Sequence, residues 1–429
     1  MSEPTKFELL RKGFVDEYIN DPNDPREVWF DPVNNRVIRE VKMPIALRAI
    51  GFLKDSFAVE RIEDTTVIQR KLLFPNNIGI WSSAQVLHQA GFILELYDLL
   101  KGLQVNLYDG HPYNVVFEGS EPRWVDLGSL RSFSEPKGSC VDQINEFVAL
   151  AEFFRIGFCH KIRKICVDCS SEVQVTKPLW INDVELMLKT CFEGLAEKDP
   201  NLSYVEKFYR LRDGENRQRE GTWIGYSESL YTSEKGKTPS VYEKIINRVI
   251  GENNIKTMID IGCNNGKYSV IAARQGVEVL ALDVEDALIC ELFKYVSEEK
   301  LTITPVVSNL SLYCQTCNLT HKQFRPKVDL ILAYAILHHM FHQDYITHGS
   351  KYDFESFFEE IKIFEPKVLI LGFVSYDDIA FVQAENRKDW YNLENFLRVA
   401  HQKGYSTDVI PTNNTARNII VCRQLSLDV

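Results

Sequence analysis

The feature that most constrains the fold is a short apolar run that ends in an acidic residue and is followed by two closely spaced glycines. It reads MIDIGCNNG over residues 258–266 and contains Asp260, Gly262 and Gly266. Because glycine has no side chain, the backbone can turn sharply there and come close to a ligand. The run therefore predicts a strand, a tight turn and the start of a helix.

A second apolar run, VLAL over residues 279–282, ends at Asp283, 17 positions after Gly266. An acidic residue at the end of the next strand is placed to accept hydrogen bonds from two ribose hydroxyls. Together, the two runs predict a pocket for a cofactor that carries adenosine.

The identity of the cofactor follows from what the glycine pattern lacks. A dinucleotide fingerprint reads G-x-G-x-x-G, but here Asn264 takes the place of the middle glycine, and the residue three after Gly266 is Ser269. A cofactor without a pyrophosphate needs no such phosphate-binding turn, so the pattern favours S-adenosylmethionine (SAM) over NAD. An ordinary strand, turn and helix with chance glycines is the alternative.

The rest of the C-terminal half alternates between strand and helix patterns. Strands are expected at 302–309, 328–333, 367–373, 405–411 and 417–423, and helices at 240–250, 354–364 and 393–402. This alternation predicts a doubly wound α/β sheet. Ligands of such sheets bind at the carboxyl ends of the strands, and four candidate residues fall there: Asp260, Asp283, Asn309 and Ala333.

Three segments, MIDIGCNNGKYS, LALDVED and VDLILAYAILHHM, strongly resemble class I SAM-dependent methyltransferases, and especially the nodulation-protein (NoeA-like) group. The resemblance covers roughly residues 205–424 and implies a Rossmann-like sheet. It implies that Asp260, Gly262 and Gly266 shape the methionine side of the SAM site, with Asn264 in place of the commoner glycine.

The same resemblance implies that Asp283 holds the ribose and that Asn309 lies near the adenine. Methyl transfer from a sulfonium is an in-line displacement, in which alignment of donor and acceptor lowers much of the barrier. His338 and His339 follow a predicted strand and are candidate bases if the acceptor is a hydroxyl or an amine. The alternative is that the pair only shapes the loop.

The N-terminal half carries a kinase-like pattern. Asp109 is followed by Asn114, a short apolar run and then Asp126 in an Asp-x-Gly sequence. This order is similar to the catalytic and metal-binding loops of protein and aminoglycoside kinases, in which the first Asp orients the acceptor and the other two residues hold Mg²⁺. Expected helices at 84–100 and 141–154 match a kinase C-lobe, which implies an α+β domain.

The nucleotide-covering part of a kinase is not recognisable in the sequence. Residues 1–70 contain no Gly-x-Gly-x-x-Gly loop, and Lys42 and Lys71 are the candidate phosphate-binding lysines. We therefore expect a degenerate kinase-like domain at 1–205 and a methyltransferase domain at 206–429. A polar, charged stretch at 211–221 has the composition of a linker or exposed loop.

Charge and composition limit the partners. The 429-residue chain has a net charge of −11, which argues against a protein dominated by nucleic-acid backbone contacts. It contains no apolar run long enough for a membrane span and no signal-peptide pattern, so a cytoplasmic protein with reduced cysteines is expected. The last residues, Gln424 to Val429, partly resemble the tail with which bacterial DNA enzymes bind the sliding clamp.

Two CxxC pairs, Cys166 with Cys169 and Cys314 with Cys317, have the spacing of zinc ligands. Their distance in sequence favours free cysteines, and no metal is expected. Three functions remain open: a methyltransferase acting on a small molecule or carbohydrate, a macromolecule methyltransferase whose kinase-like domain docks the target, and a non-catalytic interaction protein.

Overall fold

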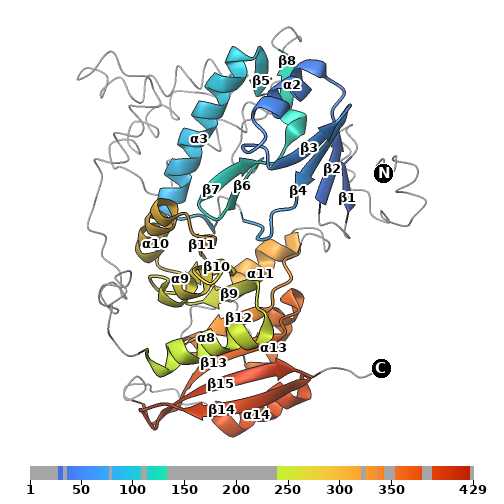
Figure 1. The fold of residues 1–429 in the computed structure, drawn as a ribbon. Coiled ribbons are helices and arrows are strands. Elements are labelled where there is room, and N and C mark those ends of the chain that lie inside the picture. The colour runs from blue at the N-terminus through green and yellow to red at the C-terminus, as the bar shows by residue number, and fades with distance from the viewer. Residues whose placement is uncertain are drawn as a thin grey trace, which may run out of the picture. The chain divides into compact units, whose positions relative to one another are not determined.

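The computed structural model describes residues 28–31, 36–76, 80–107, 114–132, 239–319, 325–334, 336–342, 353–378 and 389–425. These residues form two compact units, one mainly before residue 133 and the other mainly after residue 238 (Figure 1). The expected boundary between residues 205 and 206 and the expected helix 141–154 lie outside the described residues.

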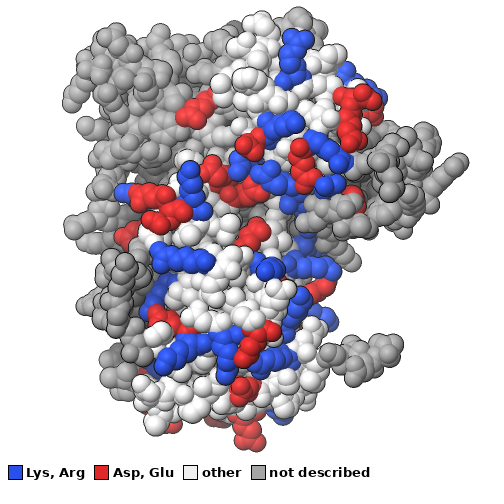
Figure 2. Space-filling view, viewed as in Figure 1, with Lys and Arg blue, Asp and Glu red and all other residues white. Residues whose placement is uncertain are grey.

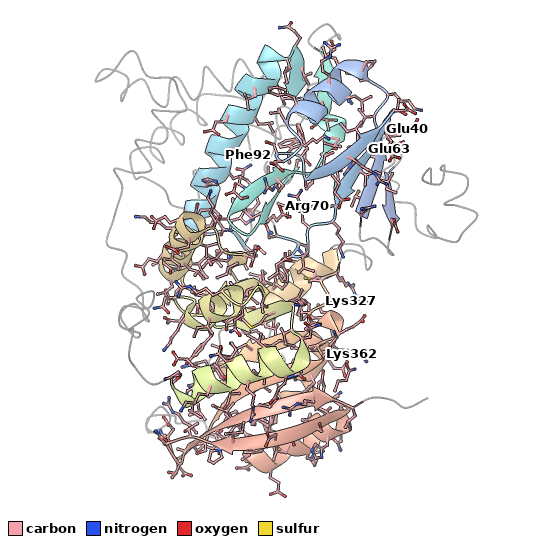
Figure 3. All side chains as sticks on the ribbon, viewed as in Figure 1. Glu40, Glu63, Arg70, Phe92, Lys327 and Lys362 are labelled. Carbon is pink, nitrogen blue, oxygen red and sulfur yellow. The ribbon has the colours of Figure 1, made fainter. Side chains whose placement is uncertain are left out.

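The N-terminal unit begins with an antiparallel sheet of order β1-β2-β4-β3. Its strands are β1 (Val28–Asp31), β2 (Arg36–Glu40), β3 (Val59–Glu63) and β4 (Thr66–Arg70), and helix α2 (Pro44–Phe52) connects β2 to β3. Glu40 and Glu63 both lie opposite Thr66 at one end of the sheet, whereas Arg70 lies at the other end (Figure 3).

The remainder of this unit is helix α3 (Ser83–Gly102) with two short strand pairs. Helix α3 confirms the helix expected at 84–100. Strand β5 (Val105–Leu107) pairs with β8 (Leu130–Ser132), and β6 (Val115–Glu118) pairs with β7 (Glu121–Trp124). The turn η3 (Leu127–Ser129) precedes β8. The described residues of this unit therefore mix helices with antiparallel strands, as expected for an α+β domain.

The C-terminal unit is built on a seven-stranded sheet of order β11-β10-β9-β12-β13-β15-β14. The strands are β9 (Thr257–Ile261), β10 (Glu278–Asp283), β11 (Ile303–Val307), β12 (Leu330–Ala333), β13 (Val368–Val374), β14 (Tyr405–Pro411) and β15 (Arg417–Gln424). Strands β9 to β13 are parallel, and β15 runs antiparallel to both of its neighbours. The doubly wound α/β sheet is confirmed.

Helices connect the parallel strands and cover both faces of the sheet. They are α8 (Val241–Asn253), α9 (Lys267–Ala273), α10 (Asp286–Glu299), α11 (Leu310–Leu319), α12 (Leu337–His342), α13 (Phe354–Ile361) and α14 (Leu393–Gln402). Helices α8, α9 and α10 share one buried cluster with the sheet. On the opposite face, Phe396 of α14 packs against Phe373 of β13.

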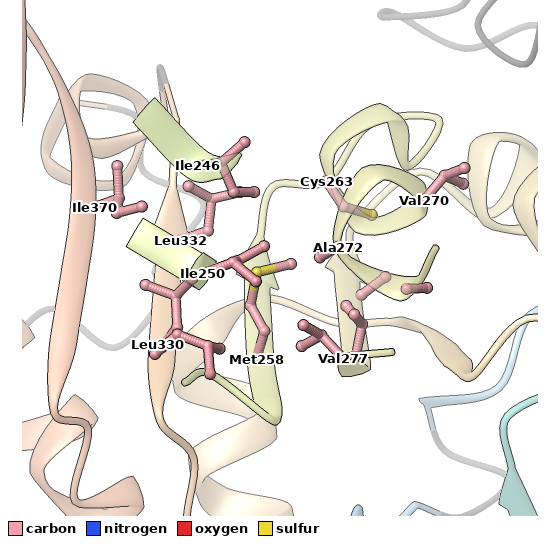
Figure 4. Packing of buried hydrophobic residues seen from close by; sticks show 14 of the residues in the cluster. Ile246, Ile250, Met258, Cys263, Val270, Ala272, Val277, Leu330, Leu332 and Ile370 are labelled. Carbon is pink, nitrogen blue, oxygen red and sulfur yellow. The ribbon is translucent and has the colours of Figure 1, made fainter. Parts of the chain in front are cut away.

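The shared cluster explains why the central strands of the sheet are mainly apolar. Ile246 and Ile250 of α8 lie against Met258, Leu330 and Leu332 (Figure 4). Alternate strand residues point to opposite faces, and both faces of a doubly wound sheet are covered by helices, so β12 and β13 read as continuous apolar runs.

The turn between β9 and α9 is closed by glycines that have no room for a side chain. Gly262 has a φ of +68° and Gly266 a φ of +84°, both in the left-handed region. A Cβ on Gly262 would lie 2.8 Å from the side chain of Ile336, and one on Gly266 would lie 2.5 Å from that of Leu292. Both glycines are therefore required by packing as well as by backbone conformation.

Gly266→Ala is expected to destabilise the C-terminal unit more than Gly276→Ala. Gly276 has a similar φ of +80°, but nothing lies within 4 Å of its Cβ position. Both substitutions place alanine in the left-handed region at a cost of about 1–2 kcal/mol. Gly266→Ala adds overpacking against Leu292, typically ~1–3 kcal/mol. Urea denaturation of both variants checks this, and equal losses of stability would contradict it.

Candidate functional site

The strand order of the sheet reverses at the carboxyl ends of β9 and β12. The chain leaves β9 and moves outward through β10 to β11, then returns to add β12 on the other side of β9. In open α/β sheets, ligands bind where the strand order reverses in this way. The turn from Gly262 to Gly266 follows β9 and lies at this point.

Asp283, the last residue of β10, joins this strand to the turn that follows β9. One carboxylate oxygen accepts a hydrogen bond from the backbone N–H of Asn264 at 2.8 Å, and the other accepts one from Glu285 at 3.0 Å. Burial raises the pKa of Asp283, whereas these backbone N–H groups favour its ionised form. The carboxylate is thus oriented on the turn, at the edge where a ligand would sit.

Asp260 lies deeper than Asp283. It is 3% exposed, and its carboxylate accepts a hydrogen bond from the Ser269 hydroxyl at 2.6 Å. Burial raises the pKa of Asp260 to about 7; the bond from Ser269 opposes this rise, and the nearby charge of Asp283 adds to it. Asp260 therefore joins the end of β9 to α9 and titrates close to neutral pH.

Asn264 adopts a left-handed conformation with a φ of +54°, which asparagine tolerates better than most residues. Its side-chain oxygen accepts a hydrogen bond from the N–H of Asn265 at 2.9 Å. The side chain therefore stabilises the turn locally, and the backbone N–H is the part of Asn264 that reaches Asp283.

Two further predicted residues lie at strand ends in different environments. Asn309 follows β11, and its side-chain oxygen accepts a hydrogen bond from the N–H of Leu312, at the start of α11. Ala333 ends β12 and is fully buried. A ligand at Ala333 would therefore meet its backbone or the neighbouring Tyr334.

An exposed apolar residue that the sequence reasoning did not single out lies beside Asp283. Val284 is 51% exposed. The signal was present in the sequence, because an apolar residue directly after Asp283 continues the strand pattern past its end. Val284 offers an apolar surface next to the carboxylate.

His338 and His339 lie on α12, which follows β12. Their ring centroids are 3.9 Å apart, and His338 is 7% exposed. Burial lowers the pKa of His339, so this imidazole is neutral at pH 7. The segment just before the pair packs on the glycine turn, because Ile336 is the side chain that a Cβ on Gly262 would meet.

In the N-terminal unit, Asp126 caps the turn η3 by accepting a hydrogen bond from Gly128 N–H at 2.9 Å. An ion pair of 3.7 Å joins it to Arg39 on β2. The sequence reasoning proposed Lys42 and Lys71 and missed Arg39. The carbonyl of Asn114 accepts a bond from Val125 N–H at 2.8 Å, and Asp109 lies outside the described residues.

The cysteine pairs can be followed only in part. Cys166 and Cys169 lie outside the described residues. Cys314 and Cys317 are buried on α11, and burial raises the pKa of both thiols, so both are protonated at neutral pH. Among the residues that the structure describes, no three His, Cys, Asp or Glu side chains gather as a metal site requires. In the same part of the chain, no helix is long and apolar enough to cross a membrane.

Comparison with protein families gives one match. Residues 259–362 match the family model described as a methyltransferase domain, which is about a quarter of the chain. The matched region includes Asp260, the glycine turn, Asp283 and the His338–His339 pair. A search of curated proteins finds no match.

Several solved structures are similar to part of the chain. WbdD, in complex with the kinase inhibitor LY294002, has 14% sequence identity and a TM-score of 0.31, and the alignment covers 43% of this chain and 39% of WbdD. A SAM-dependent methyltransferase from Clostridium acetobutylicum ATCC 824 has 14% identity and a TM-score of 0.32, over 43% of this chain and 91% of its own. The chain thus aligns with less than half of WbdD.

A third similar structure is the magnesium protoporphyrin IX methyltransferase ChlM from Synechocystis PCC 6803 with bound SAH. It has 15% identity and a TM-score of 0.30, over 44% of this chain and 89% of its own. The assignment rests on the family match and on the arrangement of the glycine turn and the two carboxylates. Together they identify residues 259–362 as part of a SAM-dependent methyltransferase domain.

Proposed function

We propose that the protein transfers the methyl group of SAM to a small molecule or a carbohydrate. The observation that carries this proposal is the Asp283 carboxylate, held by the glycine turn at the point where the strand order reverses. The choice of a carbohydrate acceptor rests on the resemblance to the NoeA-like group. Figure 2 shows basic and acidic side chains interspersed over one face, which favours no large anionic partner there.

The described residues can hold each part of SAM. Asp283 would accept hydrogen bonds from the two ribose hydroxyls, and Val284 would pack against the adenine, with Asn309 nearby. The turn from Gly262 to Gly266 would take the methionine part, because it follows β9 at the reversal of strand order. SAM supplies a methyl group on a positively charged sulfur, and the chain's residues align this donor with the acceptor.

We assign the base to the histidine pair. His339 is half-buried and neutral, so its imidazole can accept a proton from an acceptor hydroxyl or amine at neutral pH. His338, in ring contact with it, would orient the imidazole. Both residues follow β12, and Ile336, just before them, packs on the glycine turn. This supports a position of the histidine pair close to the methyl donor.

Asp283→Ala is expected to weaken SAM binding about tenfold or more, because hydrogen bonds to a charged group are lost. Isothermal titration calorimetry with SAM and with SAH measures this. Asp286→Ala, three residues further on at the start of α10, is the matched control and should bind like the wild type. Thermal unfolding confirms that each variant is folded. A folded wild type that binds neither ligand would overturn the proposed function.

SAM affinity is expected to rise with pH across neutrality. The raised pKa of Asp260 leaves this group partly protonated at pH 7. A cationic ligand favours the ionised carboxylate, so binding should release a proton and strengthen severalfold between about pH 6 and 8. Calorimetry at several pH values in the wild type and in Asp260→Asn separates this effect from titration of SAM itself. An unchanged pH dependence in Asp260→Asn would contradict it.

The second candidate function concerns the N-terminal unit, which we propose binds a nucleotide. Its sheet carries a helix between the second and third strands, and Arg39 on β2 is paired with Asp126 of the Asp-x-Gly sequence. In kinases, a strand lysine contacts the phosphates, and the Asp of this sequence holds Mg²⁺. Arg39 would take the place of that lysine.

One feature of this unit favours binding over phosphoryl transfer. Active kinases pair the strand lysine with a glutamate on the following helix, and α2 reads PIALRAIGF, without an acidic residue. Arg39 instead donates from Nε to the side chain of Gln69 at 3.0 Å. We therefore propose a degenerate kinase-like domain that retains a nucleotide site.

ATP is expected to raise the thermal unfolding temperature of the wild type but not that of Arg39→Ala. The matched control is Arg36→Ala, because Arg36 lies on the same strand, on the opposite face, and pairs with Glu60. Differential scanning fluorimetry with and without Mg²⁺ measures both shifts. The absence of any shift in the wild type would leave the unit as a binding platform for another partner.

The other expectations from the sequence remain proposals, with less support than the two functions above. A macromolecular acceptor would be docked by the N-terminal domain, and a non-catalytic interaction protein would bind partners without methylating them. Docking on the sliding clamp through Gln424 to Val429 involves a tail of which only Gln424 and Leu425 lie among the described residues, Leu425 being 53% exposed. We retain the cytoplasm as the proposed location.

A further inference from the structure

Three tyrosines from three different elements meet at the candidate site. Tyr242 lies in the first turn of α8, Tyr268 in the first turn of α9, and Tyr334 directly after β12. The ring of Tyr334 contacts that of Tyr242 at 4.9 Å between centroids and that of Tyr268 at 4.8 Å, with interplanar angles of 83° and 72°. The Tyr334 hydroxyl donates to the carbonyl of Tyr242 at 3.1 Å.

This tyrosine triad lies on the ligand side of the sheet. Helix α8 leads into the start of β9, so the first turn of α8 lies toward the carboxyl end of β9. Helix α9 begins and β12 ends at this same end. The triad is therefore at the reversal of strand order, where a ligand is expected. All three rings are half-buried and pack on the apolar cluster that helices α8, α9 and α10 share with the sheet.

The triad is uncharged, yet its rings can attract a cation. Burial raises the pKa of Tyr268 and Tyr334, so both phenols remain protonated at neutral pH. The face of a tyrosine ring is electron-rich and attracts a cation within about 6 Å of the centroid. Lys267 already shows this: its ammonium lies 5.8 Å from the centroid of Tyr268. Glu243 neutralises that ammonium at 2.8 Å.

The two carboxylates of the site are engaged by other groups. Asp260 accepts the hydroxyl of Ser269, and Asp283 accepts two backbone N–H groups. These hydrogen bonds leave the negative charges in place, and electron-rich groups close by would add to the attraction of a positive charge at the methionine end of the site. The tyrosine rings are such groups, and they lie at the end of β12 and at the starts of α8 and α9.

We propose that the tyrosine triad is the surface against which the positively charged sulfur of SAM lies, with Tyr334 as its central ring. This proposal rests on the proposed function. It makes the triad a specificity determinant, because SAH has the same adenosine and amino-acid parts but a neutral sulfur. Removal of the ring should weaken the binding of SAM more than that of SAH.

The test compares the ratio of the two affinities in the wild type, Tyr334→Leu and Tyr334→Phe. Isothermal titration calorimetry gives Kd for SAM and for SAH on the same preparation, so the ratio does not depend on the folded fraction. Tyr334→Leu is expected to shift the ratio against SAM by about fivefold. Tyr334→Phe keeps the ring and loses only the bond to the Tyr242 carbonyl, so its ratio should match the wild type.

Tyr268→Leu provides a second variant if Tyr334→Leu does not fold, and the same shift against SAM is expected. An equal loss of affinity for both ligands, in either leucine variant, would overturn the proposal and make the rings a packing wall. A wild type that binds neither ligand would instead overturn the proposed function. A shift in Tyr334→Phe as large as in Tyr334→Leu would assign the effect to the hydroxyl and also overturn the role of the ring.

Discussion

The glycine turn between β9 and α9 fits between two apolar side chains, and the rest of the site depends on that fit. Ile336 approaches Gly262 from the segment before α12, and Leu292 approaches Gly266 from α10. Close packing leaves no space for even one additional carbon at either position. The turn is therefore held by the elements that follow β12 and β10. Helix α12 carries the histidine pair, and Asp283 ends β10 shortly before α10 begins.

The glycine turn gives two aspartates at the ends of neighbouring strands different environments. Asp260 lies beneath the turn and bonds to Ser269, so burial dominates its pKa. Asp283 lies against the outer side of the turn and receives the N–H of Asn264. Asp260 thus fixes helix α9, whereas Asp283 presents its carboxylate at the carboxyl ends of the strands. The difference comes from burial and hydrogen-bond donors.

In the N-terminal unit, an ion pair joins the sheet to the Asp-x-Gly turn. The expected lysines, Lys42 and Lys71, lie outside β2 and β4, whereas Arg39 lies within β2 and pairs with Asp126. A guanidinium and an ammonium are not interchangeable, because the planar guanidinium presents several donors at fixed angles. Here Arg39 divides its donors between Gln69 and Asp126, which joins the sheet to the Asp-x-Gly turn.

In the C-terminal unit, the sequence predicted the strands and the helices α8, α13 and α14, but it did not predict α10, α11 or α12. The helix expected at 393–402 and the strand at 405–411 have the bounds of α14 and β14, and β9, β10 and β13 lie within one residue of their predicted runs. Apolar periodicity, glycines and helix caps act over a few residues, so they can be recognised along the chain.

Only the tertiary structure decided the strand order, with β15 between β13 and β14, and the contacts of the turn with Ile336 and Leu292. It also decided that Tyr334 meets Tyr242, which lies 92 positions earlier. These features bring together residues that are distant in sequence. The local sequence around each side chain is compatible with many contact partners. The packing of the whole unit therefore selects the partner.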